Sequence, residues 1–119
     1  MKSFLILFFT TILSISNAQK GIVLVNASTF DNLIELGNHQ LLDVRTSDEF
    51  KSGYIKGAIN IDFWDPAFME LVKERFDKSL PLMIYCAGGG RSGMAASNLR
   101  KKGFKTIYDL EGGYESYTE

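Results

Sequence analysis

The sequence predicts an α/β fold built on a five-stranded parallel sheet with helices on both faces. The first observation is an alternation of short apolar runs with helix-competent stretches, which is typical of parallel sheets because each crossover needs a helix. The second is a cysteine followed by three glycines, at the point where an apolar run gives way to a helical stretch. Ligands of such sheets bind beyond the carboxyl ends of the strands, so this cysteine is expected in a ligand-binding or active site.

The strands are expected where short apolar runs occur between glycine and polar residues. In chain order these runs are residues 22–25, 41–44, 58–61, 82–85 and 106–108.

The helices are expected from their start and stop residues, at 28–36, 47–51, 66–76 and 92–102. Thr46 precedes the second helix, and Glu49 three residues later completes a capping-box pattern. Asp65 is the expected N-cap of the third helix, with Pro66 at the favoured first position. The expected stops of the other three helices are Gly37, Gly53 and Gly103.

The first 18 residues have the pattern of a secretory signal peptide. Lys2 is followed by an apolar run at 4–15 and by Ser16, Asn17 and Ala18, with small residues at the outer positions. A membrane-spanning helix needs about 20 apolar residues, so a stable membrane anchor is not expected. We therefore expect cleavage after Ala18 and one exported domain at 19–119, located in a periplasm or outside the cell.

Composition limits the classes of partner. The chain of 119 residues carries 13 basic and 14 acidic side chains, and removal of Lys2 leaves 12 basic ones and a net charge of −2. The longest basic run ends the helix at 92–102, where the helix dipole favours it. Nucleic acid is therefore not an expected partner.

Cys86 is the only cysteine, so the chain cannot form an internal disulfide. An exported protein that keeps an idle thiol risks its oxidation, which favours a chemical role. His39 is the only histidine and is expected in a surface turn at the amino end of the second strand. With one cysteine and one histidine, no ordinary metal site is expected. We expect no cofactor either.

The residues after the cysteine suit an anion. Ala87, Gly88, Gly89, Gly90, Arg91 and Ser92 lead into a helix, whose first amides lack partners and carry partial positive charge. Glycines let successive amides form a concave nest, and Arg91 adds a permanent charge. This setting favours the nucleophilic thiolate of Cys86. The alternative is a small buried core cysteine, which would need neither the glycines nor the arginine.

Other polar and aromatic residues are expected near the same edge of the sheet. Asp43 and Arg45 end the second strand, where hydrogen bonds from them could support the loop. Trp64 follows the third strand, and we expect it to pack under the helix at 66–76 rather than line the site.

Two stretches together resemble the signatures of the rhodanese domain family. Residues 41–45, with Glu49, Phe50 and the run 53–61, resemble the first signature. The loop 86–92, followed by Ala95, Ala96, Leu99 and Gly103, resembles the active-site signature. Tyr54 and Tyr117 depart from the histidine and tryptophan frequent in the family, and the chain is expected to end before the family's final helix.

The resemblance implies a rhodanese-like parallel sheet and sulfur transfer of the thiosulfate sulfurtransferase type. Cys86 would attack the outer sulfur of a small donor such as thiosulfate, hold it as a persulfide, and pass it to cyanide or a thiol. The amides of residues 87–92 would bind the persulfide anion, with added charge from Arg91. No general base is needed for this chemistry.

Three alternatives remain at this point. Phosphatase or arsenate reductase activity is disfavoured, since related loops of that kind have five residues between cysteine and arginine and this chain has four. A dinucleotide fingerprint formed by Gly88, Gly90 and Gly93, with Asp109 as the ribose ligand, leaves Cys86 unexplained. The third is a carrier or binding module, in which Cys86 receives sulfur from a partner protein or binds its thiol without turnover.

Overall fold

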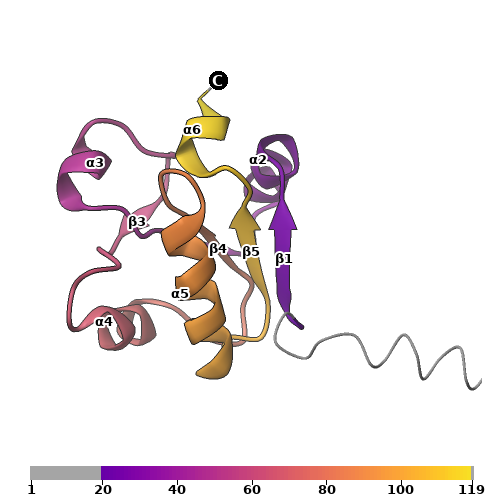
Figure 1. Ribbon diagram of the computed structural model, residues 1–119. Coiled ribbons are helices and arrows are strands. Elements are labelled where there is room, and N and C mark those ends of the chain that lie inside the picture. The colour runs from indigo at the N-terminus through magenta and orange to yellow at the C-terminus, as the bar shows by residue number, and fades with distance from the viewer. Residues whose placement is uncertain (1–19, 119) are drawn as a thin grey trace, which may run out of the picture.

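The computed structural model describes residues 20–118, so the expected signal peptide at 1–18 lies outside the described residues. The chain alternates between strands and helices (Figure 1). The elements are β1 (Ile22–Val25), α2 (Ala27–Leu36), β2 (Gln40–Asp43), α3 (Ser47–Lys51), β3 (Ile59–Asn60), α4 (Phe68–Arg75), β4 (Leu82–Tyr85), α5 (Gly90–Lys101), β5 (Ile107–Leu110) and α6 (Gly113–Tyr117).

The strands form one five-stranded sheet in the order β1-β5-β4-β2-β3, and every neighbouring pair is parallel. This confirms the predicted fold class. The central strand β4 is buried at all four positions because it has a neighbour on each side and helices on both faces. Ile84 of β4 lies opposite Leu42 of β2 and opposite Asp109 of β5. The residues that follow β4 therefore emerge between the ends of β2 and β5.

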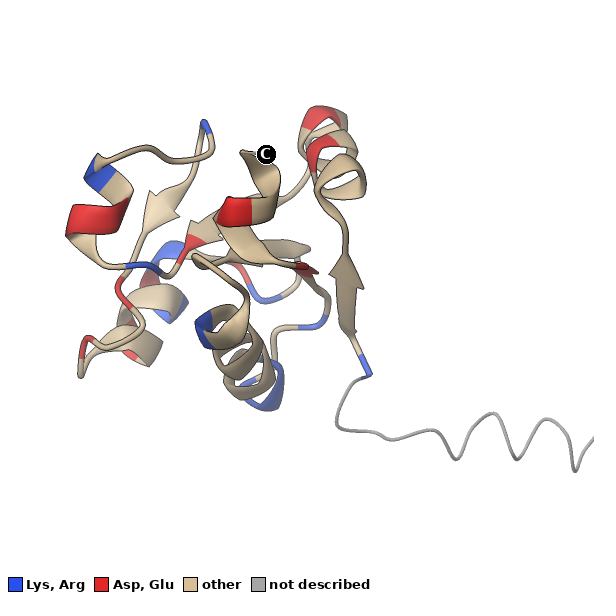
Figure 2. Cartoon of the chain, turned by 45° about the horizontal axis from the view of Figure 1, so that its top comes forward, with Lys and Arg blue, Asp and Glu red and all other residues tan. Residues whose placement is uncertain are grey.

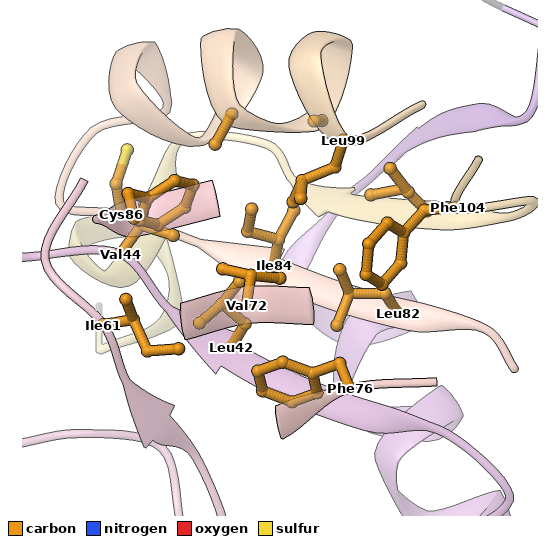
Figure 3. Packing of buried hydrophobic residues seen from close by; sticks show 14 residues of the cluster. Leu42, Val44, Ile61, Val72, Phe76, Leu82, Ile84, Cys86, Leu99 and Phe104 are labelled. Carbon is orange, nitrogen blue, oxygen red and sulfur yellow. The ribbon is translucent and has the colours of Figure 1, made fainter. Parts of the chain in front are cut away.

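Alternation along the strands divides the core into two layers. Leu82, Ile84 and Cys86 pack in a layer with side chains of α4 and α5, as Figure 3 shows from close by. Met83 and Tyr85 point to the opposite layer, which side chains of α2 and α6 cover. Cys86 is thus on the α4 and α5 face of the sheet, and its neighbour Tyr85 is on the other.

Local sequence signals explain several element boundaries. Strands β1 and β4 have the predicted bounds, and α3 has its predicted bounds and its capping box between Thr46 and Glu49. Gly37 ends α2 with a positive φ of 74°.

The third helix begins later than predicted. Asp65 is not its N-cap, because the Asp65 carboxylate accepts a hydrogen bond from the Ala67 amide at 2.8 Å and closes a turn before Phe68. Asp65 and Pro66 therefore lie in that turn. A short polar side chain before a helix can either cap the helix or close a turn, and Asp65 closes a turn. Trp64 does not pack under this helix as predicted: 64% of it is exposed, and it makes an edge contact with Phe63.

Other differences lie around the cysteine loop and at the end of the chain. Strand β3 has only two residues, and β5 extends to Leu110. Helix α5 begins at Gly90, two residues before the predicted start. No helix was predicted after Gly112, whereas the structure has the short helix α6 at Gly113–Tyr117. Within residues 20–118, none of the helices has the length and apolar character needed to cross a membrane.

Candidate active site

Cys86 is the first residue after β4, and its side chain points toward α5 (Figure 3). Only 1% of the residue is exposed. The Gly89 amide donates a hydrogen bond to Cys86 Sγ at 3.0 Å. The sulfur is therefore held by a backbone donor at the start of a helix, a setting that favours negative charge on it.

The loop owes its shape to one of its three glycines. Gly89 has φ 109° and is the N-cap of α5, whereas Gly88 and Gly90 do not have positive φ. An L-residue rarely adopts that conformation, so Gly89 is the position where the turn requires glycine. The predicted anion cradle at residues 87–92 thus has, in this structure, one amide directed at the sulfur.

Ser92 joins the sulfur to an acidic residue. Ser92 is fully buried in the first turn of α5, with its Oγ 3.5 Å from Cys86 Sγ and 3.2 Å from the Gly89 carbonyl oxygen. The same hydroxyl donates to Asp109 Oδ1 at 2.7 Å. Because Asp109 is 4% exposed and bonded to Ser92, it is not placed to bind a ribose as the dinucleotide alternative requires.

Arg91 lies beside the loop with its guanidinium bound to Glu49 of α3. The two hydrogen bonds to the Glu49 carboxylate measure 2.8 and 3.0 Å. The Arg91 hydrogen bond is the largest cause that lowers the pKa of Glu49, to about 2. Glu49 likewise raises the pKa of Arg91, with smaller contributions from the charges of Cys86 and Asp62. The predicted cation is therefore near the sulfur, but a carboxylate balances its charge.

Two acidic side chains lie near the cysteine loop: Glu49, which is bound to Arg91, and Glu115 of α6. Figure 2 shows acidic segments on α3 and α6 near the start of α5. On α6, Glu115 is close to the loop, with a carboxylate oxygen 3.8 Å from where a Cβ on Gly88 would lie. A doubly charged anion close to the loop would therefore be near two carboxylates and one cation whose charge Glu49 balances.

Asp43 and Arg45 act on the opposite face of the sheet from Cys86. Their buried side chains pair with each other, Nη2 to Oδ2 at 2.7 Å, and Arg45 also donates to the Gly53 carbonyl oxygen at 2.7 Å. The hydrogen bonds predicted to reach the loop thus go elsewhere. The support is indirect, since the Arg45 guanidinium lies 4.3 Å from the Tyr114 ring centroid and 5.5 Å from that of Tyr85.

Helix α6, which the sequence did not predict, packs against the cysteine loop. The Tyr114 amide donates to the Cys86 carbonyl oxygen at 2.8 Å, and the Glu115 amide donates to that of Ala87 at 3.1 Å. Gly113 is buried with φ 65°, and a Cβ there would lie 2.6 Å from the Cys86 carbonyl oxygen. The close approach of α6 to the cysteine loop therefore depends on this glycine.

The other missed residues are Glu49, as the partner of Arg91, and Asp109. Asp109 could have been suspected because it is a charged residue within the apolar run of β5. A charged side chain on a strand covered by a helix needs a hydrogen-bonding partner. His39 is half-buried just before β2, at the strand end away from Cys86, and its Nε2 is buried without a hydrogen-bond partner. Within the described part of the chain, no three side chains of His, Cys, Asp or Glu are grouped as metal ligands.

Comparison with known proteins places these features in a family. The model of the rhodanese-like domain matches residues 26–119. The chain is 36% identical over 93 residues to thiosulfate sulfurtransferase 16, chloroplastic, of Arabidopsis thaliana, covering 71% of this chain and 78% of that protein. It is 39% identical over 82 residues to a tRNA uridine(34) hydroxylase of Chlamydia felis, covering 65% of this chain and 25% of that protein. For three further curated relatives the match covers 48–60% of their length.

Solved structures agree with the assignment. A rhodanese-related protein from Thermoplasma volcanium superimposes with a TM-score of 0.69 at 28% identity, covering 81% of this chain and 90% of that one. A rhodanese-like domain protein from Staphylococcus aureus gives the same TM-score and identity, with coverage of 80% and 90%. On the family match and the shared fold, the chain belongs to the rhodanese-like domain family.

Proposed function

We propose that the protein is a sulfurtransferase of the thiosulfate sulfurtransferase type, with Cys86 as its nucleophile. The observation that carries the proposal is the position of Cys86 Sγ, buried at the end of the central strand and bonded to the Gly89 amide at 3.0 Å. A sulfur atom held by a backbone donor at a helix start is suited to bear negative charge. Two relatives named thiosulfate sulfurtransferases, from Arabidopsis thaliana, support this activity.

The proposed reaction has two displacements. In the first, the Cys86 thiolate attacks the outer sulfur of a small donor such as thiosulfate, so that a new S–S bond forms and sulfite leaves with the electron pair of the old one. In the second, cyanide or a thiolate attacks the terminal sulfur of the persulfide and regenerates the Cys86 thiolate. Neither step needs a metal or a cofactor, and the loop at 87–92 would stabilise the persulfide anion.

A carrier that acts with a partner protein is the second candidate. Exposed apolar side chains favour it: Tyr54 is 50% exposed and Trp64 is 64% exposed, the latter on the loop that follows β3. Aromatic residues of this kind are common in protein interfaces. In this version Cys86 receives sulfur from, or binds, a thiol of the partner.

We also propose that the protein is exported by a signal peptide at 1–18 and acts in a periplasm or outside the cell. The support is the sequence pattern described above. Intact mass of the protein recovered from an outer fraction of the producing cell tests this. A mass that begins at Gln19 is expected, and recovery of the chain only with Met1 in the cell interior would contradict export.

Intact-mass analysis of residues 19–119 tests the activity. The reduced protein is exposed to thiosulfate beside a Cys86→Ser variant, which preserves the size of the side chain and removes the nucleophile. We expect a gain of one sulfur atom on the unmodified protein alone, and its loss, with release of thiocyanate, on addition of cyanide. A gain on both proteins would exclude Cys86 as the acceptor. No gain on either would leave the carrier as the function to pursue.

A further inference from the structure

Asp109 is a buried acidic residue for which the proposed reaction has no role. It lies in β5 at the level of Ile84 in β4, on the sheet face covered by α5. It is 4% exposed, and among residues 20–118 no Lys, Arg or His forms an ion pair with it. A carboxyl group without a cation is costly to bury in its charged form. The side chain that satisfies it is Ser92, which also contacts the sulfur of Cys86.

Ser92 can serve only one acceptor with its single proton, although its hydroxyl oxygen can accept as well. Its oxygen lies 2.7 Å from Asp109 Oδ1, 3.2 Å from the Gly89 carbonyl oxygen and 3.5 Å from Cys86 Sγ. If the Ser92 proton points to Asp109, only lone pairs remain for Cys86, and these suit a protonated thiol. If the proton points to Cys86, it stabilises a thiolate or a persulfide anion.

We propose that Asp109 is a positioning residue which, through Ser92, shares one proton with Cys86. When Cys86 loses its proton, that proton passes to Ser92 Oγ as the Ser92 proton passes to Asp109. The carboxylate becomes a carboxyl group, Ser92 remains a hydroxyl, and the negative charge moves from Asp109 to the sulfur. No other reactant is consumed. The proposal rests on the sulfurtransferase function only for its effect on turnover, since the proton balance of Cys86 exists without a donor.

The surroundings of Asp109 fit this role. Burial raises the pKa of Asp109 to about 6, and the hydrogen bond from Ser92 opposes that rise. A carboxyl group that titrates near neutral pH can hold a proton during a reaction there. At its level in the sheet, β1 presents Leu24 and β4 presents Ile84, both apolar. The charged or titratable groups of β5 itself, of the adjoining elements and of the loop are Tyr85, Cys86, Arg91, Arg100, Lys101, Tyr108, Glu111, Tyr114, Glu115 and Tyr117. Of these, Arg91 is bound to Glu49.

Replacement of Asp109 by Asn separates the two orientations of Ser92. The Asn amide can donate to Ser92 Oγ as a protonated Asp109 would, which frees the Ser92 proton for the sulfur. It also removes the competing negative charge. We therefore expect the Asp109→Asn variant to form the Cys86 thiolate at lower pH than the unmodified protein.

The experiment is the rate of Cys86 alkylation by iodoacetamide from pH 5 to 9, measured for the unmodified protein, Asp109→Asn, Ser92→Ala and the double variant. We expect Asp109→Asn to displace the profile toward lower pH, and one pH unit of displacement corresponds to about a tenfold faster rate below the midpoint. In the Ser92→Ala background, replacement of Asp109 should have a much smaller effect, which a double-mutant cycle measures. Glu115→Gln is the charge control, because it removes an exposed carboxylate near the loop but outside the Ser92 contact.

Three results would overturn the proposal: no displacement in Asp109→Asn, an equal displacement with and without Ser92, or one no larger than that of Glu115→Gln. If Ser92→Ala does not fold, the carbon-13 NMR titration of the Asp109 carboxyl is the second test. A further step should appear in it where Cys86 ionises and should vanish once Cys86 is alkylated, whereas an unchanged titration would contradict the shared proton. Alkylation needs no sulfur donor, so a failure of sulfur loading would remove the proposed function without affecting this test.

Discussion

At the scale of single residues, the ion pair between Arg91 and Glu49 sets the net charge beside Cys86 that a donor would meet in the proposed reaction. Replacement of Glu49 by Gln removes the negative charge, while Gln can still complete the capping box with Thr46. We expect the kcat/KM for thiosulfate to rise, by up to about fivefold, since partly exposed charge pairs are worth about 1 kcal/mol at most. Steady-state kinetics with thiosulfate and cyanide measures the change.

Asp48→Asn is the matched control for that substitution. Asp48 lies next to Glu49 in the same helix, and its replacement removes the same charge without touching Arg91. The gain from Glu49→Gln should shrink as ionic strength rises, because salt screens charges near the surface. An equal gain in both variants would show a general charge effect rather than release of Arg91. No gain in either would mean that the Arg91 charge does not attract the donor.

The candidate nucleophile could be predicted from the sequence, but its partners could not. Cys86 and the glycine loop stand together in the chain, so their chemistry is visible in one run of residues. The partners of Arg91 and Ser92 are 42 and 17 residues away from them, and only the folded sheet brings these groups together. Asp43 and Arg45 show the opposite error. They end a strand beside β4, but strand alternation directs them to the face away from Cys86.

At the scale of elements, the contact between α6 and the cysteine loop depends on Gly113. Substitution by Ala places a Cβ against the backbone of Cys86 and Ala87 and adds the strain of a positive φ. The strain alone costs about 1–2 kcal/mol for an L-residue. We expect Gly113→Ala to lose more than that in the free energy of unfolding, measured in urea. Alkylation of Cys86 should also slow or accelerate measurably, because the loop must move.

Gly37→Ala separates strain from contact. Gly37 has a similar φ of 74°, but no atom lies within 4 Å of where its Cβ would be. The Gly37→Ala variant should lose only the free energy of unfolding that the strained backbone costs. The alkylation rate of Cys86 should stay unchanged. Equal losses of stability in the two variants, with no effect on alkylation, would mean that α6 does not hold the loop.

Element prediction succeeded where local signals act alone. The capping box of α3 and the apolar run of β4 gave the observed bounds, since both are written within a few neighbouring residues. Helix α6 was missed because its five residues have little helical tendency of their own, and its first amides are satisfied by carbonyl groups of the cysteine loop. A helix that is stabilised by tertiary contacts leaves a weak local signal.

At the scale of the whole molecule, the fold class followed from the alternation of strands and helices, but the strand order did not. The alternation requires parallel neighbours joined by helical crossovers, and it leaves open which strand is central. The central position of β4, between β5 and β2, places Cys86 in the middle of the sheet edge. The uniformly apolar sequence of β4 is typical of a strand that is buried on both faces. It was the sequence feature that indicated a central position for β4.

The stability of the whole molecule should carry opposite contributions from Glu49 and Asp109 as pH changes. The folded state lowers the pKa of Glu49 from 4.5 to about 2, so its contribution is present above pH 4.5 and is lost as pH falls toward 2. The folded state raises the pKa of Asp109 from 3.8 to about 6. Its penalty is absent below pH 3.8, grows as pH rises, and is complete above pH 6.

Asp109→Asn isolates the second contribution. The free energy of unfolding of the unmodified protein, measured in urea, should fall relative to that of the variant between pH 4 and pH 7, by up to about 3 kcal/mol. Contributions of the groups common to both proteins largely cancel in this difference, including that of Glu49. A constant offset between the two proteins would reflect a changed hydrogen bond to Ser92 and not the titration. A difference that stays constant over this range, or one that changes in the opposite sense, would mean that Asp109 does not carry the cost of a buried charge.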